Sequence, residues 1–206
     1  MVERALREPV EWGVATKSRR GEATSGDLAV VALLPEGTLV AAIDGLGHGE
    51  EAARAARSAG DVVRDRPSQD LVLLAERCHR ALRHTRGAAL SLAFVSTLES
   101  SITWLGVGSV EGRVVGGDRM GMRPKGSLAL ESGIPGHELP TVRSATMKVR
   151  PGDVLLLATD GIEASFADAL DISGTPQAIS ERILAAHRRP TDDALVVAVR
   201  YLGARS

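Results

Sequence analysis

Residues 27–45 read DLAVVALLPEGTLVAAIDG, two short runs of aliphatic side chains joined by a Pro-Glu-Gly turn. Such runs, bounded by turn residues, are typical of a β-hairpin whose strands are buried on both faces. If Pro35 and Glu36 form the turn, counting outward places Asp27 opposite Asp44, and a turn one residue different moves that register only slightly. In either register we expect two carboxylates at the open end of one hairpin.

Apolar spacing on both sides of this hairpin predicts further strands and helices in blocks: strands, helix pair, strands, helix pair, strand. Consecutive strands with short turns imply antiparallel pairing, and this order differs from the alternation of a doubly wound parallel sheet. We therefore expect a single domain over residues 1–206 of the α+β class, an αββα sandwich of two antiparallel sheets with a helix pair outside each. The predicted strands are 10–17, 28–34, 39–43, 90–97, 102–107, 113–115, 141–149, 154–158 and 195–199; the predicted helices cover 50–66, Ser68 to the stop at Gly87, 162–170, and Thr175 to the stop at Pro190.

The composition excludes several classes of function. The chain carries 25 Lys and Arg against 26 Asp and Glu, so no electrostatic attraction to nucleic acid or to an anionic membrane is expected. Cys78 is the only cysteine, which excludes an intrachain disulfide and a thiolate cluster. The N-terminus is charged and the apolar runs are too short to span a bilayer. We expect a cytoplasmic monomer with no nucleic-acid or membrane partner.

Further aspartates lie where predicted strands meet loops. Asp160 follows the strand 154–158, while Asp192 and Asp193 directly precede the strand 195–199. If these two strands pair in antiparallel fashion, Asp160 meets Asp192. Crowded carboxylates stay ionised only beside a cation or a shared proton, and hard oxygen ligands suit Mg²⁺ or Mn²⁺ rather than zinc.

Simpler interpretations of the same residues remain open. Asp44-Gly45 and Asp160-Gly161 are each common turn dipeptides. The glycine-rich residues 45–49 could bind phosphate, although they lack both the GxGxxG spacing and a P-loop Lys-Ser/Thr. Of the histidines, only His48 lies beside the predicted acids, and Cys78 falls on an apolar helix face, where packing is its expected role.

Taken jointly, four stretches resemble the metal-dependent serine/threonine phosphatases of the PP2C type, and most closely the compact SpoIIE-like bacterial branch. The resemblance extends to the stand-alone feedback phosphatases of the bacterial stressosome through residues 105–112 and 133–140. The family fold is an αββα sandwich, in agreement with the organisation above. The four stretches are Ser25-Gly26-Asp27, AIDGLGHG over 42–49, LATDGIE over 157–163 and TDDA over 191–194.

The resemblance implies a set of metal ligands and catalytic acids. Asp44 would bridge two Mn²⁺ or Mg²⁺ ions, and the carbonyl of Gly45 would serve the second ion. Asp160 and Asp192 would complete the first site, so that Asp44, Asp160 and Asp192 are the expected catalytic residues. Asp27 would hold the second ion. Asp193 is the alternative to Asp192 if the register slips by one residue.

The resemblance also implies a class of substrate, and the chain departs from the family pattern at two positions. Expected substrates are phosphorylated STAS-domain proteins of a stressosome; an anti-anti-sigma factor as target, or an inactive phosphoprotein-binding module, are the alternatives. Eukaryotic relatives place a His two residues after the bridging Asp, where this chain has Leu46, and His48 lies four residues after it. The Arg that grips phosphate in those relatives has no clear counterpart, Arg19 and Arg20 being guesses.

Overall fold

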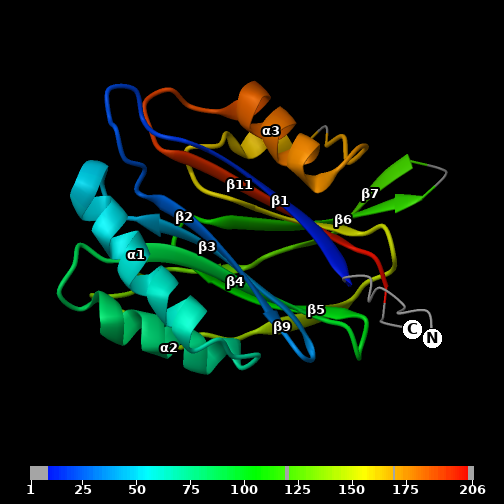
Figure 1. Cartoon of the computed structure of the whole chain (residues 1–206), viewed down its shortest axis with the longest axis horizontal. Helices are drawn as coiled ribbons and strands as arrows, with labels where there is room; N and C mark the ends of the chain where they lie inside the picture. Colours follow the sequence, from blue (N-terminus) through cyan, green and yellow to red (C-terminus); the bar gives the residue numbers. More distant parts are fainter. Residues whose placement is uncertain (1–8, 119–120, 169, 204–206) are drawn as a thin grey trace, which may run out of the picture.

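The computed structural model describes residues 9–118, 121–168 and 170–203, which form two β-sheets packed face to face with helices outside (Figure 1). Residues 1–8, which include most of the charged N-terminus noted in the sequence, lie outside the described part. No helix in the described ranges is both long and apolar enough to cross a membrane.

Each sheet follows a simple strand order. Sheet A runs β1-β11-β10-β6-β7, and sheet B runs β2-β3-β4-β5-β8, with β9 also paired to β5. All these pairs are antiparallel except β5 with β8. In sheet A the bounds are β1 Val10–Lys17, β6 Glu111–Asp118, β7 Gly121–Ser127, β10 Val154–Ala158 and β11 Ala194–Tyr201; in sheet B they are β2 Asp27–Leu34, β3 Gly37–Gly45, β4 Ala88–Ser96, β5 Ser101–Val107, β8 Leu130–Glu131 and β9 Ala145–Lys148.

Helices cover the outer face of each sheet. The helix α1 (Gly49–Asp65) packs on β2 and β3, and α2 (Leu71–Leu82) packs on α1 and β4. On the other side, α3 (Pro176–His187) packs on β1 and β11. The side chains of Asp70 and Thr175 cap α2 and α3 by accepting backbone N–H bonds from Leu73 and Ala178.

The αββα sandwich predicted from the sequence is confirmed, with two corrections. The strand predicted over 141–149 is confined to β9 (Ala145–Lys148). Residues 162–170 do not form a helix that pairs with α3; they contain one short 3₁₀ turn, η1 (Ala164–Ala167). Ile162, Phe166 and Leu170 are all buried, at the helical spacing that the sequence shows, but the backbone at the start of the segment is extended. Ile162 forms a β-bridge with Arg188, and the N–H of Glu163 donates to the carbonyl of His187 at 2.9 Å, so this part of the segment is bonded to the end of α3 and not to a helical turn of its own.

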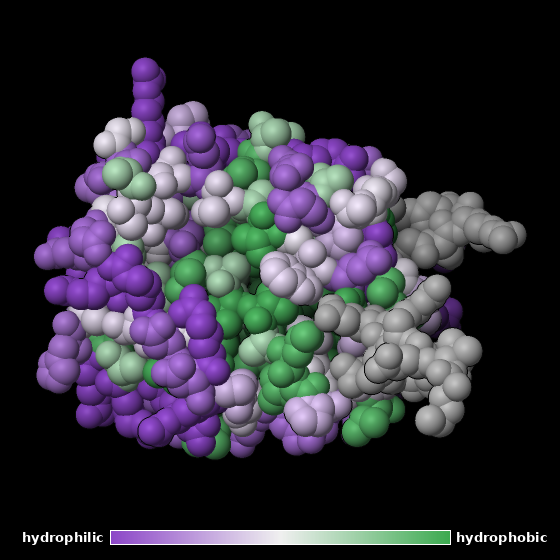
Figure 2. Space-filling model, in the orientation of Figure 1, coloured by the Kyte–Doolittle hydropathy of each residue, from purple (hydrophilic) through white to green (hydrophobic). Residues whose placement is uncertain are grey.

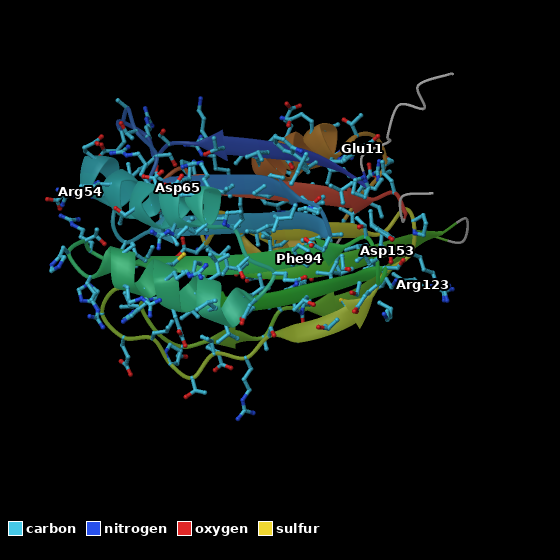
Figure 3. The ribbon with its side chains drawn as sticks, turned by 60° about the horizontal axis from the view of Figure 1, so that its bottom comes forward. Glu11, Arg54, Asp65, Phe94, Arg123 and Asp153 are labelled. Atoms are coloured by element: carbon cyan, nitrogen blue, oxygen red, sulfur yellow. The ribbon has the colours of Figure 1, made fainter. Side chains whose placement is uncertain are left out.

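Three apolar layers explain why the strands are apolar on both faces. In β3, Val40 and Ala42 face the layer between the two sheets, whereas Leu39, Ala41 and Ile43 face α1 and α2. Phe94 of β4 belongs to the same helix-side layer (Figure 3). A third layer lies between sheet A and α3. Two-sided burial gives continuous apolar runs instead of alternation.

The edge strands β1 and β2 cross the face shown in Figures 1 and 2. Figure 2 shows apolar surface in the middle of this face, bordered by hydrophilic residues. Large apolar side chains on these strands stay exposed: Trp12 of β1 to 48% and Leu33 of β2 to 53%. The outer surfaces of the helices are mainly hydrophilic.

Candidate functional site

Asp27 and Asp44 are directly paired residues of the β2–β3 hairpin, in the register that counting from the turn predicts. Asp27 is buried and Asp44 is half-buried. Burial raises the pKa of Asp27 to about 8, and the negative charge of Asp44 adds to that increase. Burial raises the pKa of Asp44 to about 7, with a further contribution from Asp160. The two acids therefore lie in a region of uncompensated negative charge.

Asp160 and Asp192 reach the same region from sheet A. The strands β10 and β11 pair in antiparallel fashion, as the sequence interpretation assumed. Burial raises the pKa of Asp160, and the nearby charge of Asp192 raises it further. Asp192 also contributes to the raised pKa of Asp44. Four carboxylates from two sheets thus lie close enough to act on one another.

Asp193 has a different role from Asp192. It is only 4% exposed, and both of its carboxylate oxygens accept backbone hydrogen bonds. Oδ1 accepts from the N–H of Arg19 at 2.7 Å, and Oδ2 accepts from that of Gly26 at 2.8 Å. Asp193 therefore fastens the β1–β2 loop to the start of β11. This engagement favours Asp192 as the metal ligand of the two.

Two hydroxyl groups that sequence reasoning missed bind the predicted acids. Thr159 Oγ1 donates to Asp27 Oδ2 at 2.7 Å and accepts from the backbone N–H of Leu195 at 2.9 Å. Ser109, between β5 and β6, donates to Asp44 Oδ2 at 3.2 Å. Both lie inside stretches that carried the family resemblance, but only the three-dimensional arrangement shows what they contact.

The glycines after Asp44 and Asp160 are required by close packing. A Cβ on Gly45 would lie 2.0 Å from the carbonyl oxygen of Ala52 in α1, and one on Gly161 would lie 1.8 Å from that of Asp193. Neither glycine has a positive φ. The Asp-Gly dipeptides are therefore contact points where the backbone after each acid meets another segment.

The other residues considered from the sequence lie outside the group of four acids. His48 is the N-cap residue of α1, and its Nδ1 forms a 2.9 Å hydrogen bond with Glu22 Oε1 in an exposed pair. The backbone N–H groups of Arg19 and Arg20 bind Asp193 and the carbonyl of Pro190. Cys78 is fully buried, and burial raises its pKa to about 12, which fits the packing role expected for it.

Another buried acid shows what a compensated carboxylate looks like in this protein. Asp153 lies at the opposite end of the molecule from Arg54 of α1 (Figure 3). It forms an ion pair with Lys125 and accepts the backbone N–H of Arg150 at 2.7 Å. The four acids described above have no lysine or arginine in ion-pair contact within the described residues. A bound cation would compensate the charge of these acids.

The donor set fits Mg²⁺ or Mn²⁺ in kind. Within residues 9–118, 121–168 and 170–203, no three His, Cys, Asp or Glu side chains are already grouped as ligands of one ion. Mg²⁺ usually keeps several waters and binds through one or two carboxylates, so a closed protein cage is not required. Carboxylates that raise one another's pKa supply both the oxygen ligands and the negative charge that such an ion needs.

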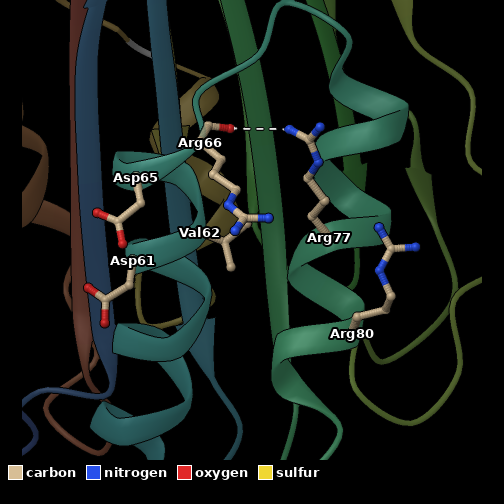
Figure 4. Close-up of a pocket in the computed structure, with 6 residues that line it drawn as sticks. All are labelled: Asp61, Val62, Asp65, Arg66, Arg77 and Arg80. Atoms are coloured by element: carbon tan, nitrogen blue, oxygen red, sulfur yellow. Dashed lines mark hydrogen bonds between the residues drawn. The ribbon is translucent and has the colours of Figure 1, made fainter.

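Two cavities lie in different parts of the molecule. One, of about 200 Å³, adjoins the acids and is lined by residues that include Ser109, Asp160 and Arg189. The other, of about 300 Å³, lies between α1 and α2 and is lined mostly by arginines and aspartates (Figure 4). Because α1 starts near the acids and this second cavity is at its far end, only the first can serve chemistry at the acids.

A family model, Stage II sporulation protein E (SpoIIE), matches residues 35–202. The chain belongs to the SpoIIE family. The match covers most of the chain, including Asp44, Asp160 and Asp192. The SpoIIE-like, PP2C-type serine/threonine phosphatase family inferred from the sequence motifs is thereby confirmed.

Individual relatives agree with this family. Phosphoserine phosphatase RsbX of Bacillus subtilis (strain 168) is 26% identical over 110 residues, which span 53% of this chain and 55% of RsbX. A solved structure described as "The bacterial stressosome: a modular system that has been adapted to control secondary messenger signaling" is 29% identical, with a TM-score of 0.83 over 94% of this chain and 100% of the other.

More distant structures share the fold. RsbX in complex with magnesium has a TM-score of 0.80 at 21% identity, over 93% of this chain and 95% of the other. The Mycobacterium tuberculosis serine/threonine phosphatase PstP/Ppp has a TM-score of 0.70 at 15% identity, over 94% of this chain and 99% of the other. The SpoIIE-family chain therefore has the PP2C fold.

Proposed function

We propose that this SpoIIE-family chain hydrolyses phosphoserine or phosphothreonine on proteins, using two Mg²⁺ or Mn²⁺ ions. The observation that carries the proposal is the convergence of Asp27 and Asp44 from sheet B with Asp160 and Asp192 from sheet A. Acids from four separated segments act on one another at one end of the sandwich.

In this proposal, Asp44 contributes to both ions, Asp160 and Asp192 complete the first site, and Asp27 with the carbonyl of Gly45 serves the second. When bound, such ions lower the pKa of water and stabilise the charge of an in-line phosphoryl transfer. The protein's own side chains hold the acids in position. Thr159 orients the carboxylate of Asp27, and Ser109 orients that of Asp44.

The proposed substrates are STAS-domain proteins of a stressosome, with the chain acting as a negative feedback regulator of stress signalling in the cytoplasm. Support comes from the printed descriptions of two similar proteins, a phosphoserine phosphatase and a stressosome structure. We further propose that residues 1–206 act as one monomeric domain. Asp160 is exposed at the end of the sandwich, which suits a folded protein surface as substrate.

The test is hydrolysis of phosphoproteins by the full chain. Mn²⁺-dependent turnover of p-nitrophenyl phosphate that EDTA abolishes is expected, and its absence would favour an inactive phosphoprotein-binding module. Among purified phosphoproteins, STAS-domain scaffolds should be dephosphorylated faster than an anti-anti-sigma factor. The reverse order would assign the chain to the second target.

The decisive variant is Asp44→Asn, which keeps the shape of the side chain and removes its charge. Loss of several kcal/mol of charge stabilisation predicts a fall in kcat of about a thousandfold or more. Asp61→Asn is the matched control, because Asp61 is exposed on α1 and pairs only with Arg64 at 2.9 Å. Near-normal turnover by Asp44→Asn would refute the role proposed for Asp44.

A further inference from the structure

The cavity beside the acids is built from parts of the chain that are far apart in sequence. Ser109 and Glu111 come from the β5–β6 connection, Asp160 follows β10, and Arg189 follows α3. Its volume of about 200 Å³ lies below the range of about 300–1,000 Å³ that is usual for sites of drug-sized ligands. A cavity of this size suits one side chain or one phosphoryl group.

Arg189 is fixed by its backbone. Its N–H donates to the carbonyl of Gly161 at 2.8 Å, and its own carbonyl accepts from the N–H of Asp192 at 3.3 Å. It therefore stands between the segments that carry Asp160 and Asp192. The position of its side chain relative to both acids is set by the same loop that places Asp192.

The guanidinium group of Arg189 is available to a ligand. Arg189 is exposed, and none of the ion pairs among the described residues involves it. Its positive charge nevertheless acts on Asp160, lowering a pKa that burial and Asp192 raise. The neighbouring Arg188 differs, because its guanidinium donates to the carbonyl of Ser18 at 2.8 Å. Arg188 holds the loop, whereas Arg189 faces the cavity.

The charges around the cavity leave one role for Arg189. Glu111 is already neutralised by Arg113 at 2.7 Å, so the negative charge at the cavity is that of the metal-binding acids. A phosphate dianion that approaches those acids needs positive charge and N–H donors on its outer side. A guanidinium group offers several donors in a planar array that matches two phosphate oxygens.

We propose that Arg189 binds the phosphoryl oxygens of the substrate in this cavity, which Asp160 also lines. The inference rests on the proposed function and adds the residue that holds the phosphate. It also replaces Arg19 and Arg20, the arginines considered from the sequence. Neither of them lines the cavity, whereas Arg189 does.

The experiment compares Arg189→Ala and Arg189→Lys with the control Arg80→Ala. Arg80 is an exposed arginine of α2 at the distant cavity of Figure 4. Three quantities are measured with each full-length variant: KM for a phosphoserine protein, the inhibition constant of inorganic phosphate, and the dissociation constant of Mg²⁺ by calorimetry.

Loss of charge-assisted hydrogen bonds predicts that KM and the phosphate inhibition constant rise about 10- to 100-fold in Arg189→Ala. Arg189→Lys should give an intermediate increase, and Arg80→Ala none. The Mg²⁺ dissociation constant should not rise, because removing a positive charge beside Asp160 cannot weaken cation binding. A rise in KM and in the phosphate inhibition constant without a rise in the Mg²⁺ dissociation constant distinguishes phosphate binding from a structural role of Arg189.

Unchanged KM and phosphate inhibition in Arg189→Ala would overturn this inference while leaving the proposed function intact. A joint rise of KM and the Mg²⁺ dissociation constant would overturn it too, because it would show that Arg189 only shapes the site. A wild-type chain that hydrolyses no phosphoprotein with Mn²⁺ would instead overturn the proposed function itself.

Discussion

Thr159 joins the two sheets through a single hydroxyl group. Its Oγ1 donates to Asp27 at the start of β2 and accepts from Leu195 in β11, and the residue is 1% exposed. One buried oxygen therefore fixes the direction of an acid on sheet B by reference to a strand of sheet A. Removing a group that orients a metal ligand in this way typically weakens metal binding about 10- to 100-fold.

Thr159→Val keeps the shape of this side chain and removes both hydrogen bonds. Leaving two buried polar groups without partners predicts a loss of about 1–3 kcal/mol in the free energy of unfolding. The Mg²⁺ dissociation constant should rise about 10- to 100-fold. Calorimetry and urea unfolding measure the two effects, and Thr159→Ser, which keeps the hydroxyl, is the control. Wild-type affinity in Thr159→Val would contradict the orienting role.

The raised pKa of Asp27 predicts that the stability of the metal-free protein depends on pH. Its pKa is raised from 3.8 to about 8, so the folded chain binds this proton more tightly than the unfolded chain does. The associated stability is complete below about pH 4 and is lost as the pH rises towards 8. In Asp27→Asn this contribution is absent at every pH.

In metal-free buffer, the Tm of Asp27→Asn relative to the wild type should therefore increase between pH 5 and pH 8. This interval covers most of the range between the ordinary pKa of Asp27 and its raised value of about 8. Thermal unfolding at a series of pH values measures that difference. The control Asp61→Asn, in the exposed pair with Arg64, should follow the wild type. A Tm difference that stays constant with pH would show that Asp27 keeps its ordinary pKa.

At the scale of the elements, the site depends on where two loops touch. Gly161 follows Asp160, and the missing Cβ lets its backbone meet the carbonyl of Asp193. Gly45 follows Asp44 and meets α1 in the same manner. The acids are thus placed by backbone contacts one residue further along the chain.

Gly161→Ala should reduce turnover without altering any acid. The new Cβ would lie 1.8 Å from the Asp193 carbonyl oxygen, so the loop that carries Asp192 has to shift. Misplacement of about 1 Å can cost about a hundredfold in rate. The control Gly126→Ala places its Cβ 3.2 Å from the flexible side chain of Met147. Equal kcat values for the two variants would show that the Gly161 contact does not position the site.

The sequence allows the hairpin and its register to be predicted because both are local. Two aliphatic runs around Pro35 and Glu36 leave one pairing, and Asp27 opposite Asp44 follows from it. The edge strand β7 was not predicted, since Gly121–Ser127 contains Pro124, three charged or polar side chains and little apolar alternation. The helix predicted over 162–170 is wrong for a different reason. Ile162, Phe166 and Leu170 are buried at helical spacing, but a long-range β-bridge between Ile162 and Arg188 keeps the start of the segment extended.

The acids of the site could be predicted from the sequence, but the side chains that contact them could not. Asp27, Asp44, Asp160 and Asp192 stand beside strands, and strand ends can be read from apolar runs. The hydroxyls of Thr159 and Ser109 contact acids that are far away in the sequence, and Arg189 lines a cavity made by three separated segments. Their residue types are common in loops, so no local signal separates them from their neighbours.

At the scale of the whole molecule, ions at this site would connect the two sheets. Asp27 and Asp44 belong to sheet B, whereas Asp160 and Asp192 flank strands of sheet A. A ligand that binds only when both sheets are in place stabilises the folded chain as a whole. Metal binding and global stability are therefore expected to be coupled.

Mg²⁺ at about 100 times its dissociation constant should add about 2.7 kcal/mol to the free energy of unfolding. For a chain of this size, that corresponds to a rise in Tm of about 5–10 °C. Scanning calorimetry with and without the ion measures the shift, and Asp44→Asn should largely lack it. An equal shift in that variant would place the stabilising ions elsewhere on the protein.

The strand order has a consequence for how the polypeptide matures. β1 lies at the edge of sheet A, and its partner there is β11, so Val10 pairs with Tyr201. During synthesis β1 must therefore wait, with its apolar face uncovered, until β11 has left the ribosome. Asp192 emerges just before β11. The acid cluster is thus incomplete until the strand that closes sheet A is made, and the site and the sheet are completed together.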